Sequence, residues 1–306
     1  MRLRAAAITL GADVAGREAI AGLRDAGVPV LLLKGPALTH AFGSRRVYGD
    51  VDLLVPPGEA DRAGTVLESL GFRRLLRDGD VPLRGAQHAH EWRRDADRAS
   101  VDLHVTLSGA GVPPEAVWAA LDATAGPLGS GEVNARVPAP HALALLVALH
   151  AAHHGPGETK PLADLERALT VLPSETWRAA AELATRLDAR AAFAAGLRLS
   201  PAGRQLAGRL GLGRRMTPDV SLRAAGAPPP ALGLLGLLES DGGIRAKAGL
   251  VARGLVPSPA GLRLGRPIAR RGPLGLATAY VTHPLWLARH LPPSLAAVRR
   301  ARRECR

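Results

Sequence analysis

Two short apolar segments of this chain carry aspartates at positions where the side chains of neighbouring strands would meet. Residues 50–55 read Asp-Val-Asp-Leu-Leu-Val, and residues 101–105 read Val-Asp-Leu-His-Val. Successive side chains of a strand point to opposite faces, so Asp50 and Asp52 share a face. With Asp102 they form a predicted cluster of three carboxylates, which is costly unless a cation neutralises it. Mg²⁺ prefers such oxygen ligands and keeps phosphates and waters in its other positions, so the pattern predicts a magnesium site on a sheet.

A glycine turn precedes the first aspartate segment. The apolar run 28–33 predicts a buried strand that ends at Lys34-Gly35, and a short helix is expected over 36–42. Gly35 lets the backbone approach a phosphate closely. The chain has 37 Arg and only 3 Lys, so a lysine at position 34 indicates a need for a compact ammonium that reaches one phosphate oxygen. The segment is therefore predicted to be a phosphate-binding turn.

The remaining pattern predicts an α+β protein. Residues 87–93 and 100–105 read as an antiparallel pair, so strands and helices alternate around a small mixed sheet. From residue 138 the apolar spacing becomes helical, and the Gly-rich segment before it reads as a linker. The predicted division is a small mixed-sheet domain over residues 1–130, a mostly helical domain over 138–200, and a basic, Pro/Gly-rich, partly helical region over 201–306.

The positive charge is concentrated in the last third of the chain. The formal net charge is +13, yet residues 1–137 hold 16 basic and 17 acidic side chains, whereas residues 200–306 hold 18 basic and 4 acidic ones. A basic region of this kind is typical of surfaces that meet nucleic acid, acidic lipid or an acidic protein partner. The alternative is that the many arginines reflect codon usage in a GC-rich genome.

Cysteine content and hydropathy indicate the compartment. The single cysteine, Cys305, allows no internal disulfide and no Cys-based zinc site. No apolar run approaches the ~20 residues that a membrane span needs, and residues 1–10 lack the apolar core of a signal peptide. We expect a cytoplasmic protein without a transmembrane segment.

Taken together, these motifs resemble one family, the uncharacterised nucleotidyltransferases of the DNA polymerase β-like nucleotidyltransferase superfamily. The resemblance covers roughly residues 20–200. It implies a nucleotidyltransferase domain over residues 1–130, an NTP as co-substrate and two Mg²⁺ ions. The chain has Lys34-Gly35-Pro36 where the superfamily usually has a Gly-Ser pair. The residues that carry the resemblance are Lys34, Gly35, Arg46, Asp50, Asp52, Asp102 and His104, with His150, His153 and Asp164 in the helical part.

The resemblance implies a two-metal reaction at the aspartates. Asp50 and Asp52 would bridge the two ions, and Asp102 would hold the ion beside the nucleophile and help to deprotonate it. The expected reaction moves an NMP from an NTP to a hydroxyl group of an acceptor and releases pyrophosphate. The sequence leaves a small molecule, a protein and an RNA end open as acceptors.

Further residues are predicted to bind the nucleotide. Lys34 and Arg46 would contact the β- and γ-phosphate oxygens, beside the backbone of Gly35. His104 shares a strand face with Asp102, so it either orients that carboxylate or contacts a base.

Two alternatives stay open at this stage. His150, His153 and His154 have i, i+3, i+4 spacing, which places two metal ligands on one helix face and defines a metal-dependent hydrolase as a rival enzyme class. The same histidines could instead pack at the helix end or line a cleft that faces the nucleotide. The other alternative is a non-catalytic nucleotide- or nucleic-acid-binding module with the same fold. His88 and His90, beside a predicted strand, either face the cleft or lie in an exposed hairpin, and the hairpin is the favoured interpretation.

Overall fold

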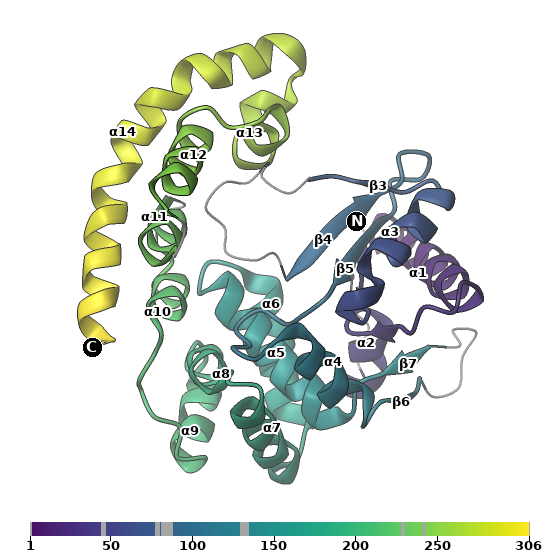
Figure 1. Ribbon diagram of the computed structural model, residues 1–306. Helices are drawn as coiled ribbons and strands as arrows, with labels where there is room; N and C mark the ends of the chain where they lie inside the picture. The colour runs from purple at the N-terminus through teal and green to yellow at the C-terminus, as the bar shows by residue number, and fades with distance from the viewer. Residues whose placement is uncertain are drawn as a thin grey trace. The chain divides into compact units, whose positions relative to one another are not determined.

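The computed structural model shows two compact units, each with its own buried apolar clusters (Figure 1). Unit 1 comprises Met1–Leu75 and His88–Arg214, and unit 2 comprises Leu76–Gln87 and Arg215–Arg306. The structure describes residues 2–43, 47–76, 80, 88–128, 135–227, 230–240 and 243–305.

Unit 1 is built on a mixed sheet, whose described strands lie in the order β3-β4-β5-β2-β1-β7-β6. β2 and β5 run parallel, with Asp52 opposite Asp102, and β4 runs antiparallel to β5, which confirms the predicted pair. β1 runs antiparallel to β2, and the N–H of Leu33 donates to the carbonyl oxygen of Asp52 at 2.9 Å. The chain therefore enters its glycine turn directly beside the aspartates. The strands are β1 (Leu31–Leu32), β2 (Asp50–Leu54), β3 (Arg73–Arg74), β4 (Ala89–Arg93), β5 (Ser100–His104), β6 (Gly126–Pro127) and β7 (Arg136–Val137).

Helix α1 covers the sheet face opposite to the aspartates. Its residues Ala15, Ala19 and Leu23 are fully buried and recur with helical spacing. Gly16 lets the helix come close to β2, since an added Cβ there would lie 3.0 Å from the side chain of Val51. Because Val51 faces α1, strand alternation turns its neighbours Asp50 and Asp52 to the other face. The other elements around the sheet are α1 itself (Arg2–Asp25), α2 (Pro36–Phe42), η1 (Pro57–Glu59), α3 (Ala60–Ser69) and α4 (Pro114–Asp122).

A group of helices completes unit 1 and confirms the predicted α+β class. The central helix, α5, is apolar on almost every side, and ten of its residues are buried. α8 packs closely on α5, because a Cβ added to Gly196 would lie 1.9 Å from the carbonyl oxygen of Ala148. The helices are α5 (Pro140–His154), α6 (Thr159–Val171), α7 (Ser174–Arg186), α8 (Arg190–Leu197) and α9 (Pro201–Arg209).

Unit 2 is helical wherever its secondary structure is regular in the described residues. α11 and α14 share a small core around Leu235 and Val298, and a second small core surrounds Leu262. No helix within the described ranges is both long and apolar enough to cross a membrane. The elements are α10 (Pro218–Ala224), α11 (Pro230–Glu239), α12 (Ile244–Leu255), α13 (Pro259–Gly265), η2 (Pro267–Arg270) and α14 (Gly272–Glu304).

Candidate active site

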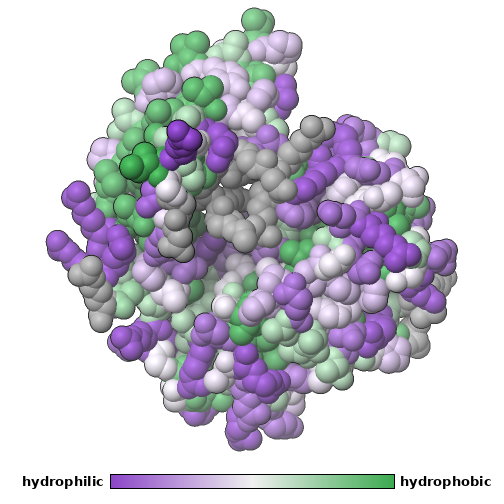
Figure 2. Space-filling model, in the orientation of Figure 1, coloured by the Kyte–Doolittle hydropathy of each residue, from purple (hydrophilic) through white to green (hydrophobic). Residues whose placement is uncertain are grey.

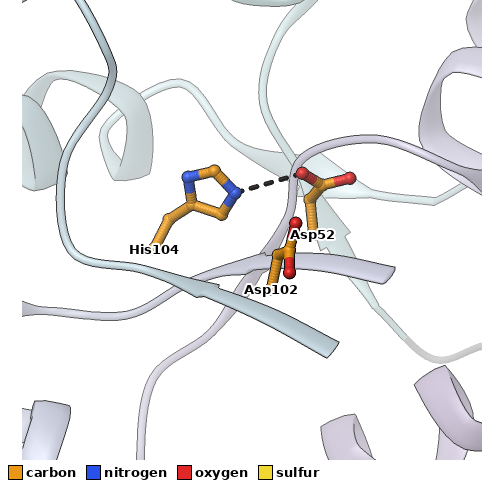
Figure 3. Close-up of side chains that lie close together, drawn as sticks. All are labelled: Asp52, Asp102 and His104. Carbon is orange, nitrogen blue, oxygen red and sulfur yellow. Dashed lines mark hydrogen bonds and ion pairs between the residues drawn. The ribbon is translucent and has the colours of Figure 1, made fainter. Parts of the chain in front are cut away.

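The parallel register of β2 and β5 brings two aspartates and one histidine together. Asp52 lies opposite Asp102, and His104 follows two residues later on the same face of β5. One ligand atom from each of the three residues lies within 4.8 Å of the other two (Figure 3). Asp52 and His104 are buried, whereas Asp102 is half-buried.

Asp52 is held by two positively polarised groups. The Nζ of Lys34 forms an ion pair with Asp52 Oδ1, and the Nε2–H of His104 donates to the same oxygen at 3.1 Å. Burial by itself raises the pKa of Asp52, but the Lys34 ammonium and the His104 hydrogen bond outweigh it, so the pKa lies well below its ordinary value. Asp52 is therefore ionised at neutral pH.

Asp102 has the opposite character. Burial, and then the negative charges of Asp52 and Asp50, raise the pKa of Asp102 to about 8. The site thus contains more carboxylate than the protein's own cations neutralise. That excess is what a divalent cation with oxygen ligands would balance, so the residues present fit a bound Mg²⁺.

Asp50 lies on the same strand face but outside the three-residue group. Its Oδ1 is 3.5 Å from the Nζ of Lys160 at the start of α6, and both side chains are about half exposed. Of the three predicted carboxylates, the structure therefore brings Asp52 and Asp102 together and places Asp50 towards solvent beside them.

The backbone of the glycine turn has a conformation that favours glycine, as expected for a turn built around Gly35. Gly35 adopts φ 64°, a left-handed conformation that favours glycine, and the ring of Tyr48 packs beside its Cα. The preceding residue, Lys34, is mostly buried and points at Asp52. Arg46, the other predicted phosphate ligand, lies outside the described residues.

A small cavity of about 30 Å³ lies beside Lys34 and His104. Its volume corresponds to about two water molecules. Four histidines contribute to its wall, together with Ser108, whose Oγ lies 2.6 Å from Nδ1 of His153. The polar lining residues are Lys34, His88, His104, Ser108, His150 and His153.

The histidine rings form a continuous chain from α5 to the aspartates. The ring of His88 lies 5.5 Å from that of His104 and 4.7 Å from that of His153. His154 continues the chain, 5.1 Å from His153 and 4.5 Å from His150. Burial, and then the charge of Lys34, hold the pKa of His150 well below its usual range, so this ring is neutral.

This arrangement corrects the expectation for His88 and weakens the rival metal site. His88 is half-buried and faces the cavity, so it does not lie in an exposed hairpin. The register of β4 and β5 pairs Ala89 with His104, so strand alignment alone gave no signal that the ring of His88 would lie beside that of His104. Among the described residues, the one grouping of three or more potential metal ligands is Asp52, Asp102 and His104, so the α5 histidines do not form a separate site there.

Comparison with known proteins gives one family and several distantly similar structures, including two of ANT(2'')-Ia. Residues 5–202 match the family described as uncharacterised nucleotidyltransferase. No curated protein sequence matches the chain. The solution structure of the antibiotic-resistance factor ANT(2'')-Ia has 18% identity and a TM-score of 0.41, over 56% of this chain and 90% of that one. The crystal structure of ANT(2'')-Ia in complex with adenylyl-2''-tobramycin has the same identity and TM-score, over 55% of this chain and 94% of that one.

The family match includes every candidate residue described above, from Lys34 to His154, and more than half of the sequence. The chain therefore belongs to the uncharacterised nucleotidyltransferase family.

Proposed function

We propose that this protein is a Mg²⁺-dependent nucleotidyltransferase that moves an NMP from an NTP to an acceptor hydroxyl and releases pyrophosphate. The observation that carries the proposal is the side-by-side pair of Asp52 and Asp102, one firmly ionised and the other with a raised pKa. Family membership supports nucleotidyl transfer in general.

We assign the metal to the carboxylates. Asp52 and Asp102 would hold one ion, and Asp50 together with Asp52 would supply carboxylate oxygens to a second, as the resemblance implies. Mg²⁺ takes oxygen ligands, so His104 serves better as the donor that fixes Asp52 Oδ1 than as a ligand. When bound, the metal lowers the pKa of a coordinated hydroxyl and neutralises phosphate charge.

The side chains around the aspartates have distinct roles in the proposed reaction. The acceptor oxygen forms a bond to the α-phosphorus while the bond from that phosphorus to the bridging oxygen breaks, and pyrophosphate leaves. Asp102 would lie on the nucleophile side and help to deprotonate the acceptor hydroxyl, as the resemblance implies. Lys34 exchanges Asp52 for a phosphate oxygen, and Gly35 admits the phosphate to the backbone. Arg46 is proposed as a second phosphate ligand.

Transfer of radiolabel tests this function directly. Each α-³²P-labelled NTP is incubated with Mg²⁺ and a panel of small-molecule, protein and RNA acceptors. We expect label on one acceptor class with the wild type, and none with Asp52→Asn. The matched control is Asp61→Asn, which changes an exposed aspartate on α3 and should transfer label normally.

Two results would contradict the assignment. Transfer by Asp52→Asn at the wild-type rate would reject the role of this aspartate. Thermal stabilisation of the wild type by NTP and Mg²⁺, without label transfer to any acceptor class, would favour the non-catalytic binding module.

A further inference from the structure

Helix α12 of unit 2 presents its apolar face to solvent. Ile244, Val251 and Leu255 are spaced i, i+7, i+11, which places them on one helix face, and their side chains are between 42 and 88% exposed. No residue of this 12-residue helix is buried. In a globular protein the apolar face of an amphipathic helix ordinarily packs on the core, so this one lacks an occupant.

The N-terminal half of α14 repeats the same pattern. Leu274, Val281 and Leu285 have the same i, i+7, i+11 spacing and are between 74 and 84% exposed. Figure 2 shows hydrophobic surface gathered over the part of unit 2 that Figure 1 labels α11, α12 and α14. We call the three residues on α12 and the three on α14 the apolar stripes.

Basic side chains flank the α12 stripe and occupy the C-terminal part of α14. At 3.6 residues per turn, Arg245 and Lys247 lie on either side of the α12 stripe. The exposed arginines Arg299, Arg300 and Arg303 follow the α14 stripe towards the end of that helix. Residues 215–306 together hold 15 basic and 4 acidic side chains.

Aliphatic side chains flanked by Lys and Arg are the composition of helices that lie in the plane of an anionic membrane surface. A second copy of the chain is a less suitable partner, because two surfaces with the same excess of positive charge repel each other. Nucleic acid is also a less suitable partner, because surfaces that bind single strands use aromatic side chains to stack on bases, whereas all six stripe residues are aliphatic.

We propose that unit 2 binds anionic lipid membranes through the apolar stripes of α12 and α14. The aliphatic side chains enter the boundary between headgroups and acyl chains, and the neighbouring Lys and Arg side chains bind lipid phosphates. This inference does not depend on the proposed nucleotidyl transfer.

Vesicle sedimentation with the full-length chain tests the proposal. We expect binding to vesicles of phosphatidylcholine with about 30 mol % phosphatidylglycerol, and much weaker binding to pure phosphatidylcholine. The triple variant Ile244→Gln, Val251→Gln, Leu255→Gln keeps the charge and should bind on the order of 100-fold more weakly. The matched control is Ala246→Gln, an exposed position on the opposite side of α12, which should bind as the wild type does.

A second variant separates charge from apolar contact. Arg245→Gln with Lys247→Gln keeps the stripe and should weaken binding about 30-fold, at about 1 kcal/mol for each charge near the surface. Far-ultraviolet circular dichroism and thermal melting of every variant check that the fold is retained, which we expect because all these side chains lie at the surface.

Three outcomes would overturn the proposal. One is vesicle binding that depends on neither feature, whether it is equal for neutral and anionic vesicles or unchanged in the triple variant. Another is tight, salt-dependent binding of a single-stranded RNA that the triple variant retains, with no vesicle binding. The third is self-association in sedimentation velocity that the triple variant abolishes, again without vesicle binding.

Discussion

Replacement of Lys34 by methionine tests the electrostatic core of the candidate site. Lys34→Met keeps most of the aliphatic stem but removes the ammonium paired with the buried carboxylate of Asp52. Loss of one partner of a buried ion pair costs about 3–5 kcal/mol, because the remaining charge stays buried without compensation. For a unit of this size that loss corresponds to a fall of about 10 °C in melting temperature.

The pH dependence of this loss has a definite sign. In the wild type the depressed pKa of Asp52 stabilises the fold above its unfolded-state pKa, and that contribution disappears only in strong acid. Without Lys34, burial raises the pKa of Asp52, so the variant becomes less stable as the pH rises from about 4. The gap between variant and wild type should therefore widen as the pH rises from strong acid, and it should be largest at pH 7 and above.

Mg²⁺ should close much of this gap. A cation bound at Asp52 and Asp102 replaces the missing positive charge, and at 100 times its Kd it adds about 2.7 kcal/mol. The assay is thermal unfolding with chelator or with Mg²⁺. The control is Lys160→Met, which removes an exposed ion pair with Asp50 and should cost less than about 1 kcal/mol. If in chelator the melting temperature of Lys34→Met equals that of the wild type, or falls no further than that of Lys160→Met, then the ionised form of Asp52 does not depend on Lys34.

Three smaller predictions concern other parts of unit 1. Asp102→Asn should abolish label transfer yet stabilise the metal-free protein at pH 8 by on the order of 3 kcal/mol. A raised pKa makes the ionised carboxylate unfavourable as the pH climbs from about 4 to about 8, so an equal gain in melting temperature at pH 4 would refute this cause. Ser108→Ala removes a hydrogen bond to His153 and should lower the free energy of unfolding in urea by about 1 kcal/mol. An unchanged free energy of unfolding would show that this bond contributes nothing to stability. Gly196→Ala forces a Cβ into the facing carbonyl oxygen of Ala148 and should lower the free energy of unfolding by more than about 3 kcal/mol. Gly208→Ala, where nothing lies within reach of the added Cβ, should not lower it. Equal effects of the two substitutions would contradict the close packing of α8 on α5.

Local patterns predicted most of unit 1. The alternation in residues 50–55 and 101–105 identified both central strands and the shared face of Asp52 and Asp102. The helical spacing after residue 138 predicted a mostly helical region over 138–200, where the structure has α5 to α8. β6 and β7 could not be predicted, because two-residue strands have no alternation and lie inside the Gly-rich segment that read as a linker.

Contacts that depend on tertiary packing could not be predicted from the sequence. Lys34 was predicted to meet phosphate, but its contact with Asp52 depends on the antiparallel return of β1 beside β2. The spacing of the α5 histidines favoured packing or a cleft lining over a metal site, but it could not show that His153 meets His88, because tertiary packing alone brings these residues to one cavity. The outward stripe of α12 was missed for a different reason, since helical spacing shows that a helix is amphipathic but not which way it faces.

The choice of lysine over arginine at position 34 follows from the two partners this side chain would have in the proposed reaction. Before substrate arrives, a single ammonium can sit against Asp52 Oδ1 while His104 donates to the same oxygen, an arrangement that a planar guanidinium fork fits poorly. An NTP with its Mg²⁺ brings a new cation for Asp52 and new anionic oxygens for Lys34 together. Each buried charge then exchanges one partner for another, so neither is left uncompensated and the exchange avoids the penalty that Lys34→Met would reveal. Mg²⁺ alone would pair with Asp52 and leave Lys34 without a counter-ion, whereas NTP alone would pair with Lys34 and leave Asp52 without one. Binding of the two should therefore be mutually dependent in the wild type, and this coupling should disappear in Lys34→Met, which calorimetric titration of each ligand with and without the other would measure.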